Sequence, residues 1–228
     1  MRVRVKVCGI TTTEAAAAAS EAGVDAVGYV FADSPRRVRI EQALALSDRL
    51  GAFVTRVAVF RYPAPDEVGA VVRALRPEMV QSEPAGDVAE TIFGASELLA
   101  VFHDTPTLGS RVREYVDQYL ERCKGRPAIL LEAPGRGGRG IRPSWDRAAA
   151  VTRDVRLVLA GGLTPENVAD AIRAVQPYAV DVSTGVEGRP GVKDPARIEA
   201  FMAAVRRAEA DVNEALARAA DPACGASR

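Results

Sequence analysis

The sequence predicts a single-domain α/β protein of the (β/α)8-barrel type, and three observations favour this fold. Eight short apolar runs recur along the 228 residues, as expected of parallel strands that are buried on both faces. Helical stretches separate these runs, and this alternation is typical of parallel α/β folds. A doubly wound open sheet is the weaker alternative, because no GxGxxG turn follows an early strand.

The predicted strands are short, and most of them end near polar or small residues. They cover residues 3–8, 26–31, 56–61, 79–81, 98–103, 128–132, 157–160 and 179–182. In a barrel of this type, chemistry is placed where strands end and helix-bound loops begin. The ends of these eight runs are therefore the places at which we expect a functional site.

The first helix has clear start and stop signals. Thr12 or Thr13, followed by Glu14, is a typical N-cap, and the alanines at 15–19 favour a tightly packed helix. Gly23 then predicts a left-handed C-cap. The sequence therefore predicts a helix that follows directly on the strand ending at residue 8.

Proline marks the beginning of several later helices. The stretches 34–50, 62–75 and 163–175 each place a proline just before or inside the predicted helix start. In the last of them, we expect Thr164 as N-cap and Pro165 at the first helical position. A final amphipathic helix covers 194–220. The barrel is predicted to span residues 1–207, with a C-terminal helix extension and polar tail at 208–228.

Composition excludes several classes of function. Thirty basic and thirty acidic residues balance, which gives no electrostatic basis for binding nucleic acid or an anionic membrane. No apolar run approaches the ~20 residues that span a bilayer, and because the first residues lack the pattern of a signal peptide, we expect none. Cys8, Cys123 and Cys224 suit neither a disulfide framework nor a metal site, and the single histidine, His103, excludes a multi-histidine zinc site. We expect a cytoplasmic protein with reduced thiols, no metal and no cofactor.

Two glycine-rich strand ends predict a phosphate site. The segments "LAGGLTPEN" and "DVSTGVE" place Gly161, Gly162, Ser183 and Gly185 directly after the last two strands. Glycines let backbone N–H groups approach an anion, and phosphate sites recur at this position in barrels. The alternative is that these glycines serve only tight turns.

Cys8 ends the first predicted strand, just before Gly9. A thiolate at the mouth of a barrel is suited to act as a nucleophile or a general base. The alternative is a small buried hydrophobic residue, which is the commoner role of cysteine.

Charged residues end other strands. Glu132, after three apolar residues, is expected to have a raised pKa and to act as a general acid. Its alternative is an ion pair with Arg136 or Arg139. Arg36 is placed to bind a substrate carboxylate with two hydrogen bonds, whereas a solvated surface charge is the alternative for Arg36 and for Arg37.

Taken together, these motifs resemble those of the phosphoribosylanthranilate isomerase family. The resemblance covers roughly residues 2–206 and is dense at both ends of the chain. It rests on "VKVCGIT", "AGVDAVGYVFADSPRRV", "VAVF" and "LAGGLTPENVADAIRAVQPYAVDVSTGVEGRPGVKDPARIEAFMAAVR". These stretches follow the family's pattern in order and spacing.

The resemblance implies an Amadori rearrangement of a phosphorylated ribosylamine in tryptophan biosynthesis. A general acid protonates the furanose oxygen, the ring opens to a Schiff base, and a general base removes the C2′ proton. The family's base matches Cys8, its carboxylate-binding arginine matches Arg36, and its strand-8 aspartate matches Asp181, which is expected to contact the substrate. The phosphate loops match the glycines and serine named above. A monomer or a homodimer is expected.

The middle of the chain departs from the family's pattern. Glu132 stands where the family has an aspartate. The additional methylene moves the carboxyl by about 1.5 Å unless the side chain folds back. A misplacement of about 1 Å can cost roughly 100-fold in rate. After Gln81, Ser82, Glu83 and Pro84 replace a Leu-His-Gly motif. His103 and Asp104 follow strand 5 instead, and His103 is expected to bind substrate or to be a satisfied core residue.

These departures leave three functions open. The first is the family's reaction on phosphoribosylanthranilate. The second is the same class of reaction on a different N-glycoside phosphate in secondary metabolism. The third is a barrel that binds a phosphorylated ligand without catalysis.

Overall fold

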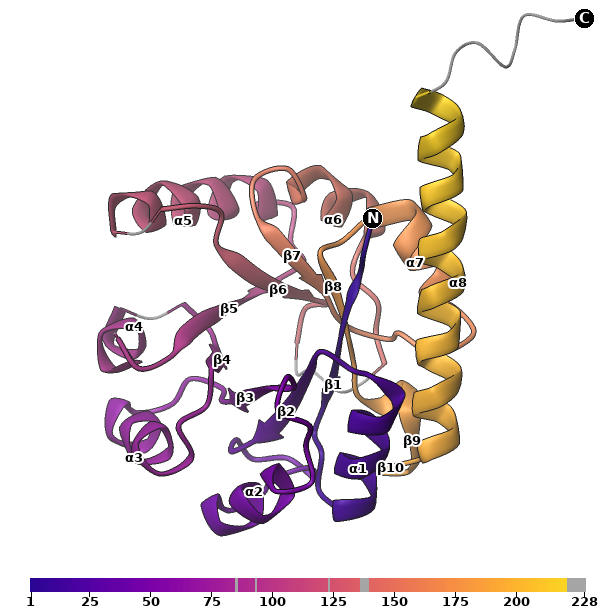
Figure 1. The fold of residues 1–228 in the computed structure, drawn as a ribbon. Coiled ribbons are helices and arrows are strands. Elements are labelled where there is room, and N and C mark those ends of the chain that lie inside the picture. Colours follow the sequence, from indigo (N-terminus) through magenta and orange to yellow (C-terminus); the bar gives the residue numbers. More distant parts are fainter. Residues whose placement is uncertain (85, 93, 123, 136–139, 221–228) are drawn as a thin grey trace, which may run out of the picture.

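The computed structural model shows a closed barrel of eight parallel strands surrounded by helices (Figure 1). It describes residues 1–84, 86–92, 94–122, 124–135 and 140–220. The strands are β1 (Arg4–Cys8), β2 (Ala26–Val30), β3 (Thr55–Val59), β4 (Met79–Ser82), β5 (Glu97–His103), β6 (Ala128–Glu132), β7 (Arg156–Leu159) and β8 (Ala179–Val182). Pairing of β1 with β8 closes the barrel. The predicted fold class is therefore confirmed, and each predicted strand lies on an observed one.

Helices cover the outside of this barrel. They are α1 (Thr13–Ala22), α2 (Ile40–Ser47), α3 (Pro65–Leu75), α4 (Gly86–Ile92), α5 (Leu108–Arg122), α6 (Trp145–Val151), α7 (Val168–Val175) and α8 (Pro195–Ala220). A 3-10 turn, η1 (Thr184–Val186), and a small hairpin of β9 (Glu187–Arg189) and β10 (Val192–Lys193) follow β8. The main apolar core fills the space between the strands and the helices.

Local sequence signals explain the ends of the first and third helices. The Thr12 hydroxyl accepts a hydrogen bond from the Ala15 N–H, and Gly23 ends α1 at a φ of 81°, as the cap pattern predicts. Pro65 opens α3 at its first position, where the missing proline N–H removes no helical hydrogen bond.

Two helices begin later than the sequence predicts. Pro35 does not open α2, because the Val38 N–H donates to the Val30 carbonyl and returns the chain to the barrel edge before Ile40. The helix expected from Thr164 is assigned from Val168, with Asn167 as its cap. Asn167 bonds back to the Thr164 N–H and to the Gly162 carbonyl, so residues 164–167 form a turn that leads into α7.

Helix α8 packs along one side of the barrel, beside α1 and α7 (Figure 1). Ala208 and Val212 belong to the main core, so the packing continues past the predicted boundary at residue 207. From residue 213 to 219 the helix is exposed. The tail at 221–228 lies outside the described residues.

Strand parity decides which side chains reach the barrel interior. Successive side chains along a strand point to opposite faces. Leu99 and Val101 of β5 and Leu130 of β6 form an interior cluster, whereas Phe102 and Leu131 pack outward into the main core. His103 and Glu132 share the inward parity of the first set and therefore face the mouth of the barrel.

Candidate active site

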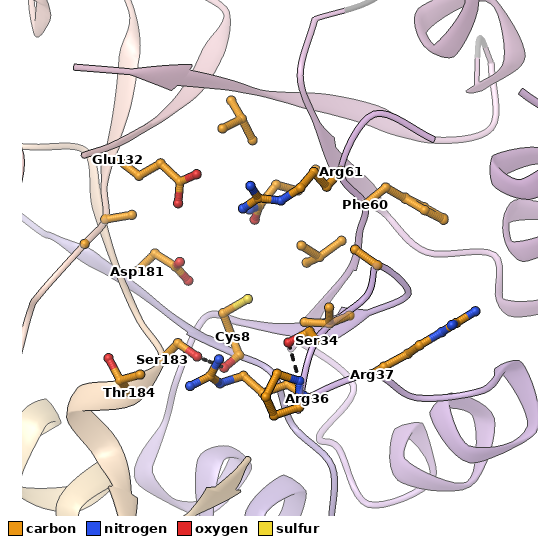
Figure 2. Close-up of a pocket in the computed structure, with 18 of the residues that line it drawn as sticks. Cys8, Ser34, Arg36, Arg37, Phe60, Arg61, Glu132, Asp181, Ser183 and Thr184 are labelled. Carbon is orange, nitrogen blue, oxygen red and sulfur yellow. Dashed lines mark hydrogen bonds between the residues drawn. The ribbon is translucent and has the colours of Figure 1, made fainter. Parts of the chain in front are cut away.

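A cavity of about 800 Å³ opens at the carboxyl ends of the strands. Figure 2 shows the side chains that surround it. The cavity is lined by residues at or just after the ends of the other seven strands and by Val101 within β5. These residues include Cys8, Arg36, Arg61, Gln81, Glu83, Val101, Glu132, Gly161, Gly162, Asp181 and Ser183. Most of the predicted site residues thus meet at one cavity, although they are spread over 175 residues of sequence.

Cys8 ends β1 and its thiol is directed into this cavity (Figure 2). Gly28 of the neighbouring strand provides the room, since a Cβ there would lie 2.9 Å from the Cys8 Sγ and 3.2 Å from the Lys6 Nζ. Burial raises the pKa of the Cys8 thiol, while the nearby ammonium groups of Lys6 and Lys193 act in the opposite direction. Cys8 therefore presents its thiol to the cavity.

Lys6 and Asp181 form a buried ion pair beneath the thiol. The Lys6 Nζ donates to the Asp181 Oδ1 at 2.8 Å, and both side chains are less than a tenth exposed. Burial opposes the Lys6 charge, but Asp181 and Cys8 outweigh it, so the pKa of Lys6 is raised. Sequence reasoning gave Lys6 no role. Lys6 could have been noticed because it is a charged residue between two valines of β1, two positions before Cys8 and therefore on the same face of the strand.

Gly28→Ala should displace the thiol, since the added methyl group would overlap Cys8 and Lys6. We expect a loss of about 1–3 kcal/mol in the free energy of unfolding and roughly a tenfold to hundredfold loss of kcat/KM. Chemical denaturation and steady-state kinetics measure the two effects. Gly51→Ala is the matched control, because its added Cβ meets only the Ser20 hydroxyl at 3.2 Å. Equal behaviour of the two variants would contradict this account.

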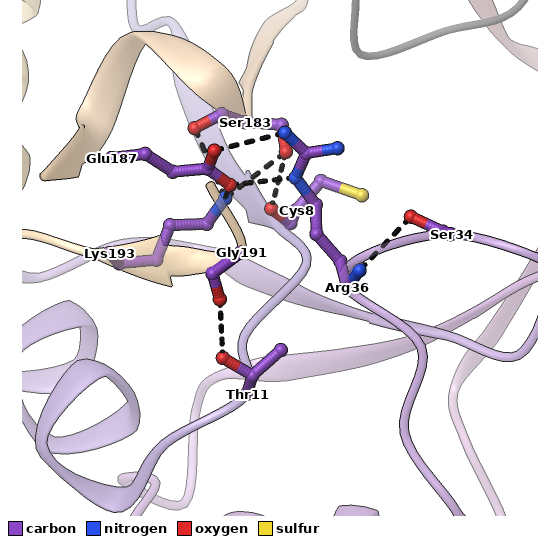
Figure 3. A network of polar contacts seen from close by, with 8 residues as sticks. All are labelled: Cys8, Thr11, Ser34, Arg36, Ser183, Glu187, Gly191 and Lys193. Atoms are coloured by element: carbon purple, nitrogen blue, oxygen red, sulfur yellow. Dashed lines mark hydrogen bonds and ion pairs between the residues drawn. The ribbon is translucent and has the colours of Figure 1, made fainter. Parts of the chain in front are cut away.

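A polar network fixes the loops after β1, β2 and β8 (Figure 3). The Ser183 hydroxyl donates to the Cys8 carbonyl at 2.9 Å, and the Lys193 Nζ donates to Ser183 and to the Glu187 carboxylate. Arg36 donates to the same carboxylate through Nε at 2.6 Å and Nη2 at 2.9 Å. This network ties the end of β1 to the loop that carries the predicted phosphate site.

The network changes the expectation for Arg36. In the structure, the carboxylate that accepts two hydrogen bonds from Arg36 is that of Glu187 in the same chain. Burial disfavours the Glu187 charge, but the bonds from Arg36 and Lys193 outweigh it and lower the pKa of this carboxyl. Glu187 and Lys193 were missed by sequence reasoning, although both stand in the quoted "DVSTGVEGRPGVKD" segment. Arg37 points away from the cavity centre (Figure 2).

The predicted phosphate glycines fit tightly against other loops. Gly161 and Gly162 have φ values of 90° and 62°, and a Cβ on either would lie within 2.6 Å of the carbonyl oxygens of Ile141 or Gly140. Gly185 is buried, and a Cβ there would lie 1.9 Å from the Leu163 carbonyl oxygen. Gly161, Gly162 and Ser183 line the cavity, whereas Gly185 lies behind it and allows the loops after β7 and β8 to approach each other.

Glu132 faces the cavity across from Arg61 (Figure 2). Burial raises the pKa of Glu132 to about 7; Arg61 lowers it, and the carboxylates of Asp181 and Glu83 raise it. A carboxyl group with this pKa is well suited to donate a proton near neutral pH. The alternative partners Arg136 and Arg139 lie outside the described residues.

His103 at the end of β5 and Asp104 directly after it are not among the residues that line the cavity. The imidazole of His103 lies between Glu83 and Glu132, with its Nε2 3.8 Å from the Glu83 Oε1 and its Nδ1 3.6 Å from the Glu132 Oε1. Asp104 is buried and accepts two hydrogen bonds from Arg147, at 2.6 and 2.8 Å, and one from the Ser144 N–H. These bonds lower the pKa of Asp104 against its partial burial. Asp104 therefore anchors the start of α6.

Fold and site together place this chain among the (β/α)8-barrel proteins whose cavity lies at the carboxyl ends of the strands, here with a thiol and a carboxyl of raised pKa in its lining. Within the described part of the chain, no helix is long and apolar enough to cross a bilayer.

Comparison with known proteins gives the family. A model of the family described as N-(5'-phosphoribosyl)anthranilate (PRA) isomerase matches residues 5–204, and the chain belongs to this family. The N-(5'-phosphoribosyl)anthranilate isomerase of Halorhodospira halophila is 40% identical over 210 residues, which are 92% of this chain and 99% of the relative. That of Geobacter sulfurreducens is 41% identical over 211 residues, covering 91% and 98%.

Solved structures agree with this assignment. The isomerase of Thermotoga maritima superposes with a TM-score of 0.79 at 34% identity, covering 90% of this chain and 99% of its own. A phosphoribosyl anthranilate isomerase in complex with reduced 1-(o-carboxyphenylamino)-1-deoxyribulose 5-phosphate gives a TM-score of 0.75 at 33% identity, with the same coverage.

Proposed function

We propose that this protein isomerises N-(5'-phosphoribosyl)anthranilate to the corresponding 1-deoxyribulose phosphate, an Amadori rearrangement in tryptophan biosynthesis. The observation that carries the proposal is the placement of the Cys8 thiol and the Glu132 carboxyl on one cavity, beside the glycine loops after β7 and β8 (Figure 2). The family assignment supports the same substrate.

Glu132 begins the reaction as general acid. Its neutral form donates a proton to the furanose ring oxygen, the C1′–O bond breaks, and the anthranilate nitrogen lone pair forms the Schiff base. With a pKa of about 7, a substantial fraction of this carboxyl holds its proton at neutral pH. Arg61 faces the carboxyl (Figure 2), and its positive charge favours the carboxylate left after the transfer.

Cys8 then acts as general base. Its thiolate removes the C2′ proton, and the electron pair of that bond neutralises the Schiff base to give an enolamine, which tautomerises to the ketose. The Lys6 ammonium favours the thiolate electrostatically, against the effect of burial. Asp181 holds Lys6 in place through their hydrogen bond. Because Asp181 also lines the cavity, we propose that it contacts the substrate sugar.

The two ends of the substrate are assigned by charge. The phosphate is proposed to bind the backbone of Gly161, Gly162 and the loop at Ser183, which lines the cavity near the N-terminal side of α7. The anthranilate carboxylate is proposed to bind Arg36. Because Nε and Nη2 of Arg36 are engaged by Glu187, the substrate meets this arginine through Nη1. Gly185 supports the phosphate loop from behind.

The direct test follows the fluorescence of anthranilate, which is lost as the purified protein converts phosphoribosylanthranilate. Turnover supports the proposal. Thermal protection by a phosphate-bearing analogue without turnover would favour another N-glycoside phosphate or a binding role. The changed side chains after β4 and β5 give the different-substrate alternative its specific basis. A monomer or homodimer and a cytoplasmic location stay predictions from the sequence.

The pH dependence has a defined sign. The pKa of the Cys8 thiol is raised and that of Glu132 is about 7, so the reactive pair of thiolate and neutral carboxyl is a minority form. Its fraction grows tenfold per pH unit below the pKa of Glu132 and is constant between the two pKa values. We expect kcat/KM to rise up to about pH 7 and then level. A decline of kcat/KM between pH 7 and 8 would instead show that the pKa of Cys8 lies below that of Glu132, and would contradict this account.

A further inference from the structure

Three charged side chains meet beside the cavity, one from the loop after β2 and two from the hairpin after β8 (Figure 3). The Glu187 Oε1 accepts hydrogen bonds from the Arg36 Nε at 2.6 Å and from the Lys193 Nζ at 2.8 Å. The Glu187 Oε2 accepts another from the Arg36 Nη2 at 2.9 Å. Arg36 and Glu187 line the cavity, whereas Lys193 does not, and its side chain is fully buried. With two cations and one anion, this cluster carries one net positive charge.

The surroundings of Lys193 show that its amine is protonated. Its Nζ lies within hydrogen-bond distance of three oxygens, which are one carboxylate oxygen of Glu187 and the carbonyl and hydroxyl oxygens of Ser183. The Ser183 hydroxyl gives its own proton to the Cys8 carbonyl, so all three oxygens accept. An ammonium has three N–H donors for them, whereas a neutral amine has only two. Burial lowers the pKa of Lys193, but Glu187 acts in the opposite direction.

Arg36 keeps one edge of its guanidinium for a ligand. A guanidinium has five N–H donors in a fixed plane, and Glu187 takes the edge formed by Nε and Nη2. Among the described residues, no hydrogen bond reaches the edge formed by Nη1 and the second N–H of Nη2, although Arg36 lines the cavity. Such an edge matches the two oxygens of a carboxylate.

We propose that Lys193 determines the preference for a carboxylate-bearing substrate, because it supplies the positive charge that Glu187 would otherwise cancel at Arg36. This inference rests on the proposed binding of the anthranilate carboxylate to Arg36. Glu187 fixes the orientation of the guanidinium, and Lys193 offsets the charge of Glu187. All three N–H donors of Lys193 are engaged within the chain, so it does not touch the substrate and is a positioning residue that acts through Arg36.

The charge balance explains why such a residue is needed. Without Lys193, Arg36 and Glu187 form a neutral pair, and a substrate carboxylate would meet the repulsion of Glu187 together with the attraction of Arg36. The nearby pair of Lys6 and Asp181 is neutral as a whole and adds no net charge. With Lys193 present, the bound carboxylate makes the cluster neutral. The ligand class that fits is a phosphorylated N-ribosyl arylamine with a carboxylate on its ring.

Two ligands that differ only in the carboxylate test this proposal. They are reduced 1-(phenylamino)-1-deoxyribulose 5-phosphate with and without an ortho-carboxylate, and calorimetry gives the Kd of each. Lys193→Met removes the charge at similar length and should lower the preference for the carboxylate ligand about tenfold. The Kd of the ligand without a carboxylate should stay unchanged, whereas structural damage would weaken both ligands. Lys193→Gln, whose amide can still donate to Ser183, replaces Lys193→Met should that variant not fold.

The double variant Lys193→Met/Glu187→Gln separates charge from structure. Arg36 then stands alone with one positive charge, which equals the net charge of the cluster in wild type, whereas Lys193→Met alone leaves it neutral. We expect the double variant to regain much of the preference that Lys193→Met loses. A purely structural role predicts a further loss on the second substitution. Arg189→Met is the matched control, because it removes a cation from an exposed position of the same hairpin and should leave the preference unchanged.

The outcomes distinguish this inference from the proposed function. A preference unchanged by Lys193→Met, or a double variant no better than the single one, overturns the role of Lys193. If wild type nevertheless converts phosphoribosylanthranilate in the fluorescence assay, the proposed function stands and only this inference is lost. Wild type that binds both ligands equally loses the assignment of Arg36 together with the inference. Wild type that shows neither turnover nor a preference for the carboxylate fails the proposed function as well.

Discussion

Cys8→Ala is expected to lower kcat about 10²–10⁴-fold, which is the usual contribution of a positioned general base. The methyl group leaves the cavity walls in place but has no atom that can accept the C2′ proton. KM should change little, because the substrate is held mainly at its phosphate and carboxylate ends. The fluorescence assay of anthranilate measures the loss of kcat. As a control for folding and phosphate binding, inorganic phosphate should raise the thermal unfolding temperature of the variant and of wild type equally.

Cys8→Ser is the matched control for the chemistry. A hydroxyl is close to a thiol in size, but its proton is far less acidic, so the serine variant should be nearly as inactive as the alanine variant. Activity of Cys8→Ala within a fewfold of wild type would remove Cys8 as the base. Asp181, whose carboxylate also lines the cavity, would then be the next candidate base to test.

Glu132→Gln should produce a loss of similar size, about 10²–10⁴-fold in kcat. The amide keeps the length and most of the shape of the side chain but cannot donate a proton to the ring oxygen. Its profile of kcat/KM should also lose the break near pH 7, because that break belongs to the carboxyl whose pKa is about 7. Retention of the break would assign it to another group.

Glu132→Asp separates the remaining interpretations of this position. If the glutamate is a longer and less well placed acid for phosphoribosylanthranilate, the aspartate variant should be more active on that substrate. If the glutamate serves a different N-glycoside phosphate, the variant should gain nothing. The competing substrates are distinguished by comparing kcat/KM of the two proteins on phosphoribosylanthranilate in the same fluorescence assay.

Much of the fold was predictable from the sequence because its signals are local. Buried parallel strands appear as short apolar runs, caps depend on a few adjacent residues, and Thr12 and Gly23 act as caps where the sequence predicts. Cys8 and Glu132 could be named as candidates for the same reason, since a reactive side chain at a strand end needs only the strand to be recognised. The positions of Pro35 and Thr164 show the limit of such signals, as contacts outside each helix moved the starts of α2 and α7.

What the sequence by itself determined is therefore the alternation of strands and helices and the residues at the strand ends. Only the tertiary structure decided the partners of those residues. It paired Arg36 with Glu187, Ser183 with Cys8, and Gly162 with the loop at Gly140, and it placed His103 between Glu83 and Glu132. The physical reason is that strand periodicity arises within a few residues, whereas each partner is set by closure of the barrel, which brings loops up to 175 residues apart into contact.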